Sequence, residues 1–296
     1  MGTDLVIAAP TFLDLTFVGL DALPAPGEER FAGSMERSPG GGGISAVAGA
    51  RLGLSVAVAA PLGSDAAGDF LRGVFEREGI AVIPRRSRHT PTTVVMPVGG
   101  EGAMVTVDEG VRAYKAEVTA FEPRAVITTL HVLHTVPDGA AAYVVCGDDD
   151  ARAFAGRPPG ELSGVRAIFV NAREAVALTG QSTVEDAADR LAQLAQTVVV
   201  TRGQEGVLAL VSGARVRFPW LDHQAAMERT GARDLLAAAH CWADLNGAEP
   251  VDCVCWSAVY ASLSLGAPTA ADGASDEARL LDEGVRAGLA PPRSRA

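Results

Sequence analysis

The chain has 296 residues, of which 48% are hydrophobic and 21% are charged, and this composition is typical of a globular protein with ample material for a core. Its formal net charge of −11 argues against binding to nucleic acid or to an anionic membrane, because both partners require a basic face. No apolar run approaches the roughly 18 residues that a membrane-spanning helix needs.

Neither the cysteines nor the N-terminus indicates export. The four cysteines are Cys146, Cys241, Cys253 and Cys255. They form no C-x-x-C pair, and they are expected to be buried, reduced thiols. The first residues carry no basic flank, and Pro10 and Asp14 interrupt their apolar run, so they predict a first strand and not a signal peptide. The expected location is the cytoplasm.

Short β-branched runs alternate with helical patterns along the chain. The expected strands are 5–9, 55–60, 131–136, 142–146, 167–171 and 197–203. The expected helices are 44–54, 67–80, 172–180, 184–196 and most of 234–265. Continuous apolar strands suit a parallel sheet that is buried on both faces. The alternation therefore predicts an α/β/α layered fold.

Two segments, about 14–38 and 92–108, do not follow this alternation. The first is polar, and the second predicts two strands around a glycine-rich turn. Both belong in a small sheet that stands off the main one, either as a lid over a cleft or as a hairpin without function.

The expected strand at 131–136 raises two questions. Only about five residues separate it from the strand at 142–146, whereas a parallel crossover usually needs about a dozen. Either the two strands are not parallel neighbours, or a helix is missing. His131 and His134 resemble a zinc-binding pair, but side chains three apart on a strand face opposite sides, so we reject a zinc site.

A run of glycines, Gly40 to Gly43, leads into the first expected helix. Glycine lets backbone N–H groups approach a ligand, and a helix N-terminus favours anions or hydroxyl oxygens. A flexible loop would have the same composition. The run does not directly follow the first strand, as a dinucleotide-binding fingerprint would, and this argues against a nicotinamide-dependent oxidoreductase.

Two further stretches lie at the ends of expected strands. Asn171 and Glu174 have the spacing of a helix capping box, or they face a metal-bound phosphate. Thr201, Gly203 and Gly206 belong to an ordinary hairpin, or they border a nucleotide.

The stretch "TGARD" (230–234) opens the last helical region. Asp234 is either a plain helix cap or a base beside an anion hole made by the N–H groups of residues 231–234. The residues alone leave both readings open.

In this order and spacing, the four stretches resemble the ribokinase-like (pfkB) family of carbohydrate kinases, and the resemblance extends from Asp14 to about Ala274. The family's glycine motif leads into a helix ending A-R-L-G, here 40–53, and its D-T-x-G-A-G-D motif corresponds to "ERTGARD" (228–234). N-x-x-E and T-x-G-x-x-G correspond to the two stretches between them. The stretch 61–80 is also similar to the family's sequence after its second strand.

The resemblance implies one domain, 1–296, with a Rossmann-like three-layer α/β/α sandwich and a small β lid. The implied reaction is phosphorylation of a hydroxymethyl group on a small sugar or nucleoside, with ATP and Mg²⁺. Lids in the family often pair into dimers, so the resemblance is compatible with a homodimer through the lid but leaves the oligomeric state open; no nucleic acid or membrane is expected as partner.

The resemblance also implies a role for each motif residue. Asp234 would be the base, and Gly231, Ala232 and Arg233 would form the anion hole. The acceptor pocket would contain Asp14, Gly40, Gly41, Gly42, Gly43 and Ser45. The nucleotide would lie against Asn171, Thr201, Gly203 and Gly206. Glu174 would hold Mg²⁺ through water.

Several residues depart from the family pattern. The substrate-binding Asn is missing, with Ile44 or Ser45 near its place, and Glu228 and Arg229 put the family's monovalent-cation loop in doubt. Arg233 replaces a glycine, where a positive φ would cost about 1 kcal/mol or more. Its side chain either obstructs the phosphate site or stabilises the transferred charge. The alternative function is a degenerate member that binds sugar or nucleotide without efficient transfer.

Overall fold

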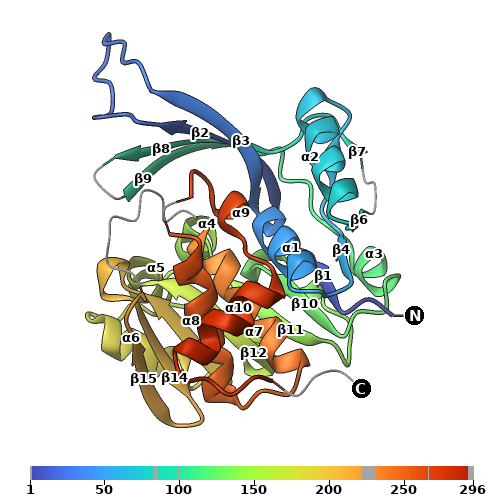
Figure 1. The fold of residues 1–296 in the computed structure, drawn as a ribbon, viewed down its shortest axis with the longest axis vertical. Helices are drawn as coiled ribbons and strands as arrows, with labels where there is room; N and C mark the ends of the chain where they lie inside the picture. The colour runs from blue at the N-terminus through green and yellow to red at the C-terminus, as the bar shows by residue number, and fades with distance from the viewer. Residues whose placement is uncertain (1, 83–85, 99–100, 222–230, 266, 293–296) are drawn as a thin grey trace.

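A mixed sheet forms the centre of the molecule (Figure 1). The computed structural model describes residues 2–82, 86–98, 101–221, 231–265 and 267–292. Within these residues the order of the main sheet is β15-β14-β13-β12-β11-β10-β1-β4-β6. Its strands are β1 Leu5–Ile7, β4 Val56–Val58, β6 Ala81–Val82, β10 Ala125–Thr128, β11 Ala141–Val145, β12 Val165–Asn171, β13 Thr197–Thr201, β14 Val207–Val211 and β15 Ala214–Phe218. Neighbours from β6 to β13 are parallel, whereas β14 and β15 are antiparallel.

Helices cover both faces of this sheet. One face packs against α1 Gly42–Arg51, α2 Ala66–Arg77, α7 Ala232–Leu245, α8 Pro250–Leu263 and α10 Glu277–Arg286. The other packs against α3 Lys115–Thr119, α4 Asp148–Ala153, α5 Ala172–Thr179 and α6 Val184–Leu191. In β12, for example, Phe169 enters the first core and its neighbours Ile168 and Val170 enter the second. This is why the strands are apolar without alternation, and the predicted three-layer α/β/α fold is confirmed.

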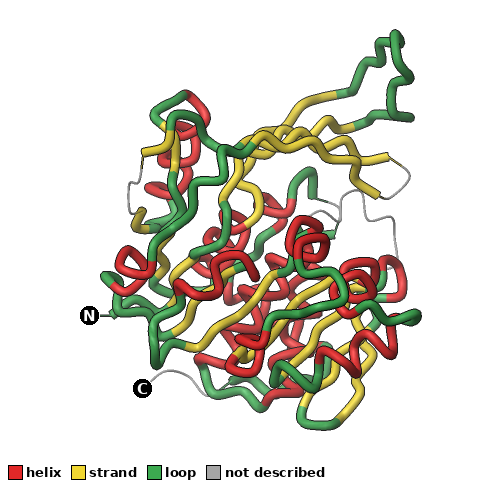
Figure 2. Tube along the Cα trace, turned by 180° about the vertical axis from the view of Figure 1, so that it is seen from behind, coloured by secondary structure: helices red, strands yellow, loops and turns green. Residues whose placement is uncertain are grey.

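A second sheet, in the order β3-β2-β8-β9, stands off one edge of the main body (Figures 1 and 2). Its strands are β2 Thr11–Val18, β3 Ser34–Gly41, β8 Thr92–Val98 and β9 Glu101–Val107. We call this four-stranded sheet the lid. The small sheet predicted from 14–38 and 92–108 is therefore present. Its first strand already begins at Thr11, so Asp14 lies inside the sheet and not in a loop. A separate pair, β5 Leu62–Gly63 and β7 Arg86–Ser87, and the short helix α9 Ala270–Gly273 complete the main elements.

The prediction of a strand at 131–136 is wrong. Residues Leu130–Thr135 form a 3-10 helix, η1, and the strand that precedes it is β10, which the prediction missed. The connection between β10 and β11 therefore spans residues 129–140 and has room for a parallel crossover. The buried carboxylate of Asp150 accepts hydrogen bonds from the backbone N–H groups of Leu130 and His131, at 3.2 and 3.1 Å. A contact from α4 thus overrides the β-branched composition of this segment.

The expected helices exist but several end earlier. The long helical run at 234–265 divides into α7 and α8, with Pro250 as the first residue of α8, where a missing N–H costs nothing.

Gly206, in the turn between β13 and β14, lies in close contact with the backbone at the end of β15. Its φ is 90°, and a Cβ there would overlap the carbonyl oxygen of Phe218. Gly213, at the other end of the same strand, also has a positive φ, 78°, but a Cβ there would meet nothing within 4 Å. The two glycines therefore allow a crowded position to be compared with an open one.

We expect Gly206→Ala to lower the free energy of unfolding by about 2–4 kcal/mol, from backbone strain and displacement of β15. Gly213→Ala should cost only about 1–2 kcal/mol, the strain alone. Urea denaturation of both variants measures the difference. Equal losses would show that the close approach at Gly206 carries no energetic weight.

Candidate active site

The motif residues from three parts of the chain gather at the carboxyl ends of β11, β12 and β13. Asn171 ends β12 and is in register with Thr201, which ends β13. The first turn of α7 packs over the same edge, because Arg233 donates a hydrogen bond to the carbonyl oxygen of Cys146, just after β11. The ligand sites of open α/β sheets lie at this edge, outside the carboxyl ends of parallel strands.

The start of α7 depends on Gly231, which has a φ of 86°. A Cβ at this position would lie 2.5 Å from Cδ1 of Ile44 and 2.8 Å from Cβ of Ala270. Only glycine therefore lets α7 begin so close to α1. The helix then runs from Ala232, and the N–H groups of its first turn have no partner inside the helix. Glu228, Arg229 and Thr230 lie outside the described residues.

Asp234 lies in this first turn, beside α1. The hydroxyl of Ser45 donates to the backbone oxygen of Asp234 at 3.0 Å and approaches its Oδ1 at 3.5 Å. Burial raises the pKa of Asp234 to about 7, although Arg233 and the Ser45 hydroxyl favour the charged form. A carboxylate with a pKa near neutrality is well suited to take a proton from a bound hydroxyl.

Ser45 itself is fully buried. Its hydroxyl bonds to Asp234 in this arrangement, and the place beside the acceptor that the resemblance implies for Ser45 stays a prediction. The role of a positioning residue was not predicted, because it depends on the packing of α1 on α7.

Arg233 adopts a helical conformation, so the strain expected from a positive φ does not arise. Among the described residues, the positive-φ positions that are not glycine are Glu122 and Ser212. The Nη1 atom of Arg233 donates to the Cys146 carbonyl oxygen at 2.6 Å and pairs with Oε2 of Glu174. Burial opposes the charge on Arg233, but the carboxylates of Glu174 and Asp234 keep its pKa above the usual value.

Asn171 and Glu174 form the capping box that their spacing predicts. Oδ1 of Asn171 accepts from the N–H of Glu174 at 2.8 Å, and Oε2 of Glu174 accepts from the N–H of Asn171 at 2.9 Å. Glu174 is only 2% exposed, and the same Oε2 atom pairs with Arg233. The carboxylate that was expected to hold Mg²⁺ through water is thus already neutralised by a side chain of the protein. The donor set around Glu174 does not fit a metal ion in this arrangement.

The glycine run is ordered and closely packed, and not a flexible loop. Gly40 and Gly41 end β3, while Gly42 and Gly43 begin α1. A Cβ on Gly40 would overlap the carboxylate of Asp14, which is itself 8% exposed. A Cβ on each of the next three glycines would come within 3 Å of Phe12, Ile7 and Pro39 respectively. Glycine is therefore required for α1 to start against β1 and β2. Because Gly40 has no side chain, the Asp14 carboxylate lies directly against its backbone.

An aromatic residue that was not predicted from the sequence holds the loop after β13 in place. Nε1 of Trp220 donates to the carbonyl oxygen of Gly203 at 2.8 Å. Gly203 has a φ of 56° and begins a short 3-10 turn that ends at Glu205. The predicted hairpin from β13 to β14 is present, and its turn lies beside Thr201 at the same sheet edge.

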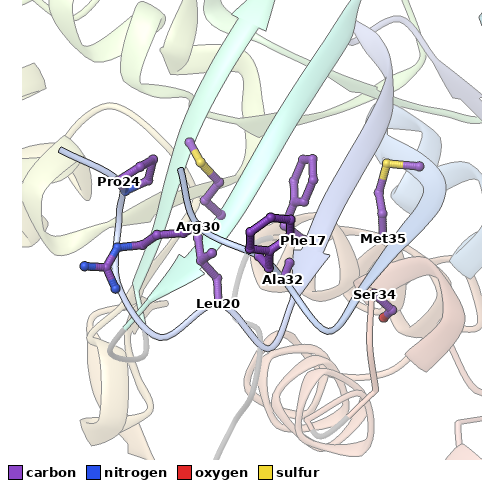
Figure 3. A pocket seen from close by; sticks show the side chains of 9 residues that line it. Phe17, Leu20, Pro24, Arg30, Ala32, Ser34 and Met35 are labelled. Atoms are coloured by element: carbon purple, nitrogen blue, oxygen red, sulfur yellow. The ribbon is translucent and has the colours of Figure 1, made fainter. Parts of the chain in front are cut away.

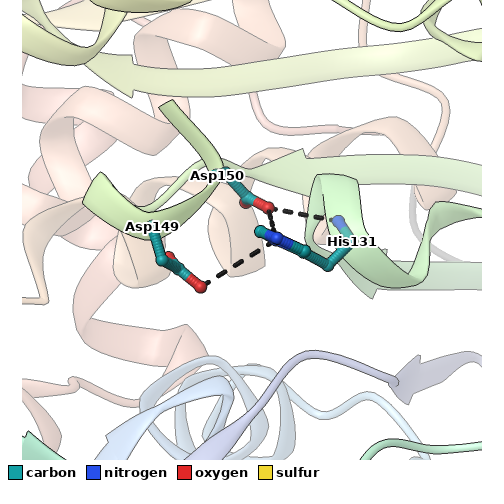
Figure 4. Close-up of side chains that lie close together, drawn as sticks. All are labelled: His131, Asp149 and Asp150. Atoms are coloured by element: carbon teal, nitrogen blue, oxygen red, sulfur yellow. Dashed lines mark hydrogen bonds and ion pairs between the residues drawn. The ribbon is translucent and has the colours of Figure 1, made fainter. Parts of the chain in front are cut away.

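His131 lies beside Asp149 and Asp150, and the ligand atoms of these three residues are within 4.8 Å of one another (Figure 4). The argument against zinc assumed a strand, and that assumption was wrong because the segment is a 3-10 helix. Asp150 is fully buried and accepts from two backbone N–H groups, while its Oδ1 lies 2.5 Å from Nδ1 of His131. This carboxylate anchors η1, and the cluster is explained by that structural role.

Comparisons with known proteins bear on the family and the fold of this chain. A family model described as pfkB family carbohydrate kinase matches residues 16–134 and 160–277. No curated protein matches the chain. Among solved structures, ribokinase from Arabidopsis thaliana, complexed with ribose and ATP, is 21% identical with a TM-score of 0.75, covering 96% of this chain and 99% of its own.

Two other structures extend the comparison. A Thermotoga maritima ribokinase is 21% identical with a TM-score of 0.78, over 96% of this chain and 99% of its own. Adenosine kinase from Sinorhizobium meliloti is 18% identical with a TM-score of 0.72, over 90% of this chain and 94% of its own. At these identities the likeness establishes the fold. No helix among the described residues is long and apolar enough to cross a membrane.

The raised pKa of Asp234 predicts a pH-dependent stability. The folded state keeps the Asp234 proton up to pH about 7, whereas the unfolded chain releases it near the ordinary carboxyl pKa of 3.8. The resulting stabilisation is complete below pH about 4 and is lost as the pH rises to about 7. Asp234→Asn should therefore match the wild type near pH 4 and exceed its free energy of unfolding by about 1–3 kcal/mol at pH 8.

Denaturant titrations across this pH range measure the effect. Asp69→Asn is the control, since the Asp69 side chain is 76% exposed and pairs with Arg72 at the surface. Parallel pH profiles for wild type and Asp234→Asn would show that Asp234 ionises normally.

Proposed function

The chain belongs to the pfkB family of carbohydrate kinases, and we propose that it phosphorylates a hydroxymethyl group on a small sugar or nucleoside. As a member of this family it is an ATP-dependent kinase; the acceptor and the roles of individual residues are the proposal. The observation that carries it is the placing of Asp234, a carboxylate with a pKa of about 7, in the first turn of a helix at the ligand-binding edge of the sheet.

In the proposed mechanism, Asp234 removes the proton of the acceptor hydroxyl as that oxygen attacks the terminal phosphoryl group. The backbone N–H groups of Gly231, Ala232 and Arg233 surround the charge that develops on the phosphoryl oxygens. Phosphoryl transfer needs little from the protein besides such positioning and electrostatic stabilisation. The helix N-terminus supplies both without any movement of the backbone.

The acceptor would lie between the lid and α7. Asp14 and the adjoining backbone of Gly40 offer a carboxylate beside bare main chain, and a carboxylate accepts hydrogen bonds from two sugar hydroxyls. Gly41 to Gly43 adjoin this pocket. Ile44, which packs against Gly231, adds an apolar wall in place of the family's Asn.

The nucleotide would lie across the ends of β12 and β13, against Asn171, Thr201, Gly203 and Gly206. Two structures of similar fold support an adenine nucleotide here, since the Arabidopsis ribokinase was solved with ATP and a Cryptococcus neoformans ribokinase with ADP. Mg²⁺ commonly accompanies ATP phosphates in kinases, and we retain it as the ion that the donor brings.

The ion pair between Arg233 and Glu174 favours a second candidate, a member of the family that binds nucleotide without efficient transfer. This candidate predicts ATP binding with no turnover on any acceptor. A thermal-shift panel of sugars and nucleosides, with and without ATP and Mg²⁺, followed by turnover assays on each hit, separates the two.

We also propose that the protein forms a homodimer through the lid, in the cytoplasm. Apolar side chains are exposed on the lid and its connecting loop, among them Phe31, Met35 and Val105. Phe31 and Met35 line a pocket of about 410 Å³ (Figure 3). A monomeric protein seldom leaves such a surface uncovered, and the corresponding surface of a second copy would bury it.

We expect Asp234→Asn to lower turnover by about 10²–10⁴ while leaving ATP affinity nearly unchanged, because the variant loses the base and keeps the helix N-terminus. Steady-state kinetics and calorimetric titration with ATP measure the two quantities. Turnover within a few-fold of the wild type would reject Asp234 as the base.

Asp14→Ala should weaken acceptor binding by about 1.5–3 kcal/mol, the scale of hydrogen bonds to a charged group, with little change in ATP affinity. Leu13→Ala, a truncation of the neighbouring buried residue in β2, is the control for lost packing. If both variants lose stability and neither changes acceptor affinity, the role of Asp14 is structural.

A further inference from the structure

Arg233 connects two strand ends and a helix start at the centre of the proposed site. Its backbone belongs to the first turn of α7, while its guanidinium reaches the Cys146 carbonyl after β11 and the Glu174 carboxylate in the first turn of α5. In the described part of the chain, both of these hydrogen bonds use Nη1. A guanidinium carries further donors on Nη2 and Nε.

The burial of Glu174 makes this contact necessary. A carboxylate that is 2% exposed is costly to keep ionised unless a positive charge lies beside it. The Asn171 N–H satisfies one lone pair but carries no formal charge. Arg233 provides the missing charge, so the protein itself fills the place where a bound cation would otherwise compensate Glu174.

The net charge of the site therefore differs from the net charge that the same site would have with glycine at position 233. Arg233 balances Glu174, which leaves Asp234 as the remaining acidic group in the first turn of α7. Without Arg233, two carboxylates would face the incoming phosphates. A nucleotide would then depend on a divalent ion to reduce the repulsion.

We infer that Arg233 is a built-in cation that replaces a divalent ion beside Glu174, so that nucleotide phosphates bind at α7 with little dependence on Mg²⁺. This inference rests on the proposed function, because it takes the N-terminus of α7 as the phosphate site. Arg233 therefore causes no backbone strain, and its guanidinium is held by Cys146 and Glu174 and is not free to follow the phosphoryl group. It sets the charge of the site through Glu174.

The test is the affinity for a non-hydrolysable ATP analogue, AMP-PNP, measured by calorimetry in excess Mg²⁺ and again in excess EDTA. For the wild type we expect chelation to raise the Kd by less than about threefold. For Arg233→Gly we expect a rise of at least tenfold, which corresponds to about 1.4 kcal/mol. Arg173→Gly is the matched control, since Arg173 also lies at the start of α5 but is exposed and pairs with Asp148; it should behave as the wild type.

Arg233→Gly leaves a buried carboxylate unpaired and risks unfolding, so Arg233→Gln is the second variant. Glutamine keeps most of the length and the helix propensity, removes the charge, and should also give at least a tenfold rise. A tenfold loss of affinity for the wild type on chelation, or equal ratios in wild type and both variants, would overturn the inference and leave the kinase assignment standing. No binding of AMP-PNP by any folded variant or by the wild type, in either condition, would instead reject the nucleotide site and the inference with it.

Discussion

The close approach of α1 to α7 is the constraint on which the proposed site depends. The two helices come from opposite ends of the chain, and they meet where Gly231 lies against Ile44 and where Ser45 bonds to Asp234. The same α1 begins in the glycine run, in which Gly40 lies against the carboxylate of Asp14 from β2. One packing contact therefore sets the position of Asp234, the proposed base, relative to Asp14 and the lid.

Burial at this contact also explains the chemistry of Asp234. Water is excluded by the two helices, and the loss of solvation raises the pKa of the carboxyl to about 7 despite the neighbouring Arg233. A base with such a pKa is half ionised at neutral pH and can both take and hold a proton. The cost appears in stability, because an ionised Asp234 is less favourable in the folded protein than in the unfolded chain.

The ion pair between Arg233 and Glu174 determines the charge of the site at the start of α5. In isolation, Glu174 has two plausible partners, the N–H of its own helix cap and an external cation. The fold supplies the first through Asn171 and a protein cation through Arg233. The departure of this chain from its family at position 233 is thus coupled to a residue that has not changed, and the two must be considered together.

The α/β/α layers and a small separate sheet could be predicted from the sequence, because apolar periodicity and turn residues are local signals. The order and spacing of the four motifs supplied the resemblance to the family, and with it the interpretation of that sheet as a lid. The sequence did not determine η1, whose backbone is held by Asp150 from a later helix, and it therefore predicted a strand there. Nor did it determine the orientation of Arg233, the role of Ser45 or the contact of Trp220 with Gly203. Each of these contacts joins residues far apart in the chain, except for the nearer Trp220 contact across the β14–β15 hairpin. These contacts follow from the tertiary structure, because the choice among several partners of similar chemistry depends on which surfaces the packing brings together and shields from water.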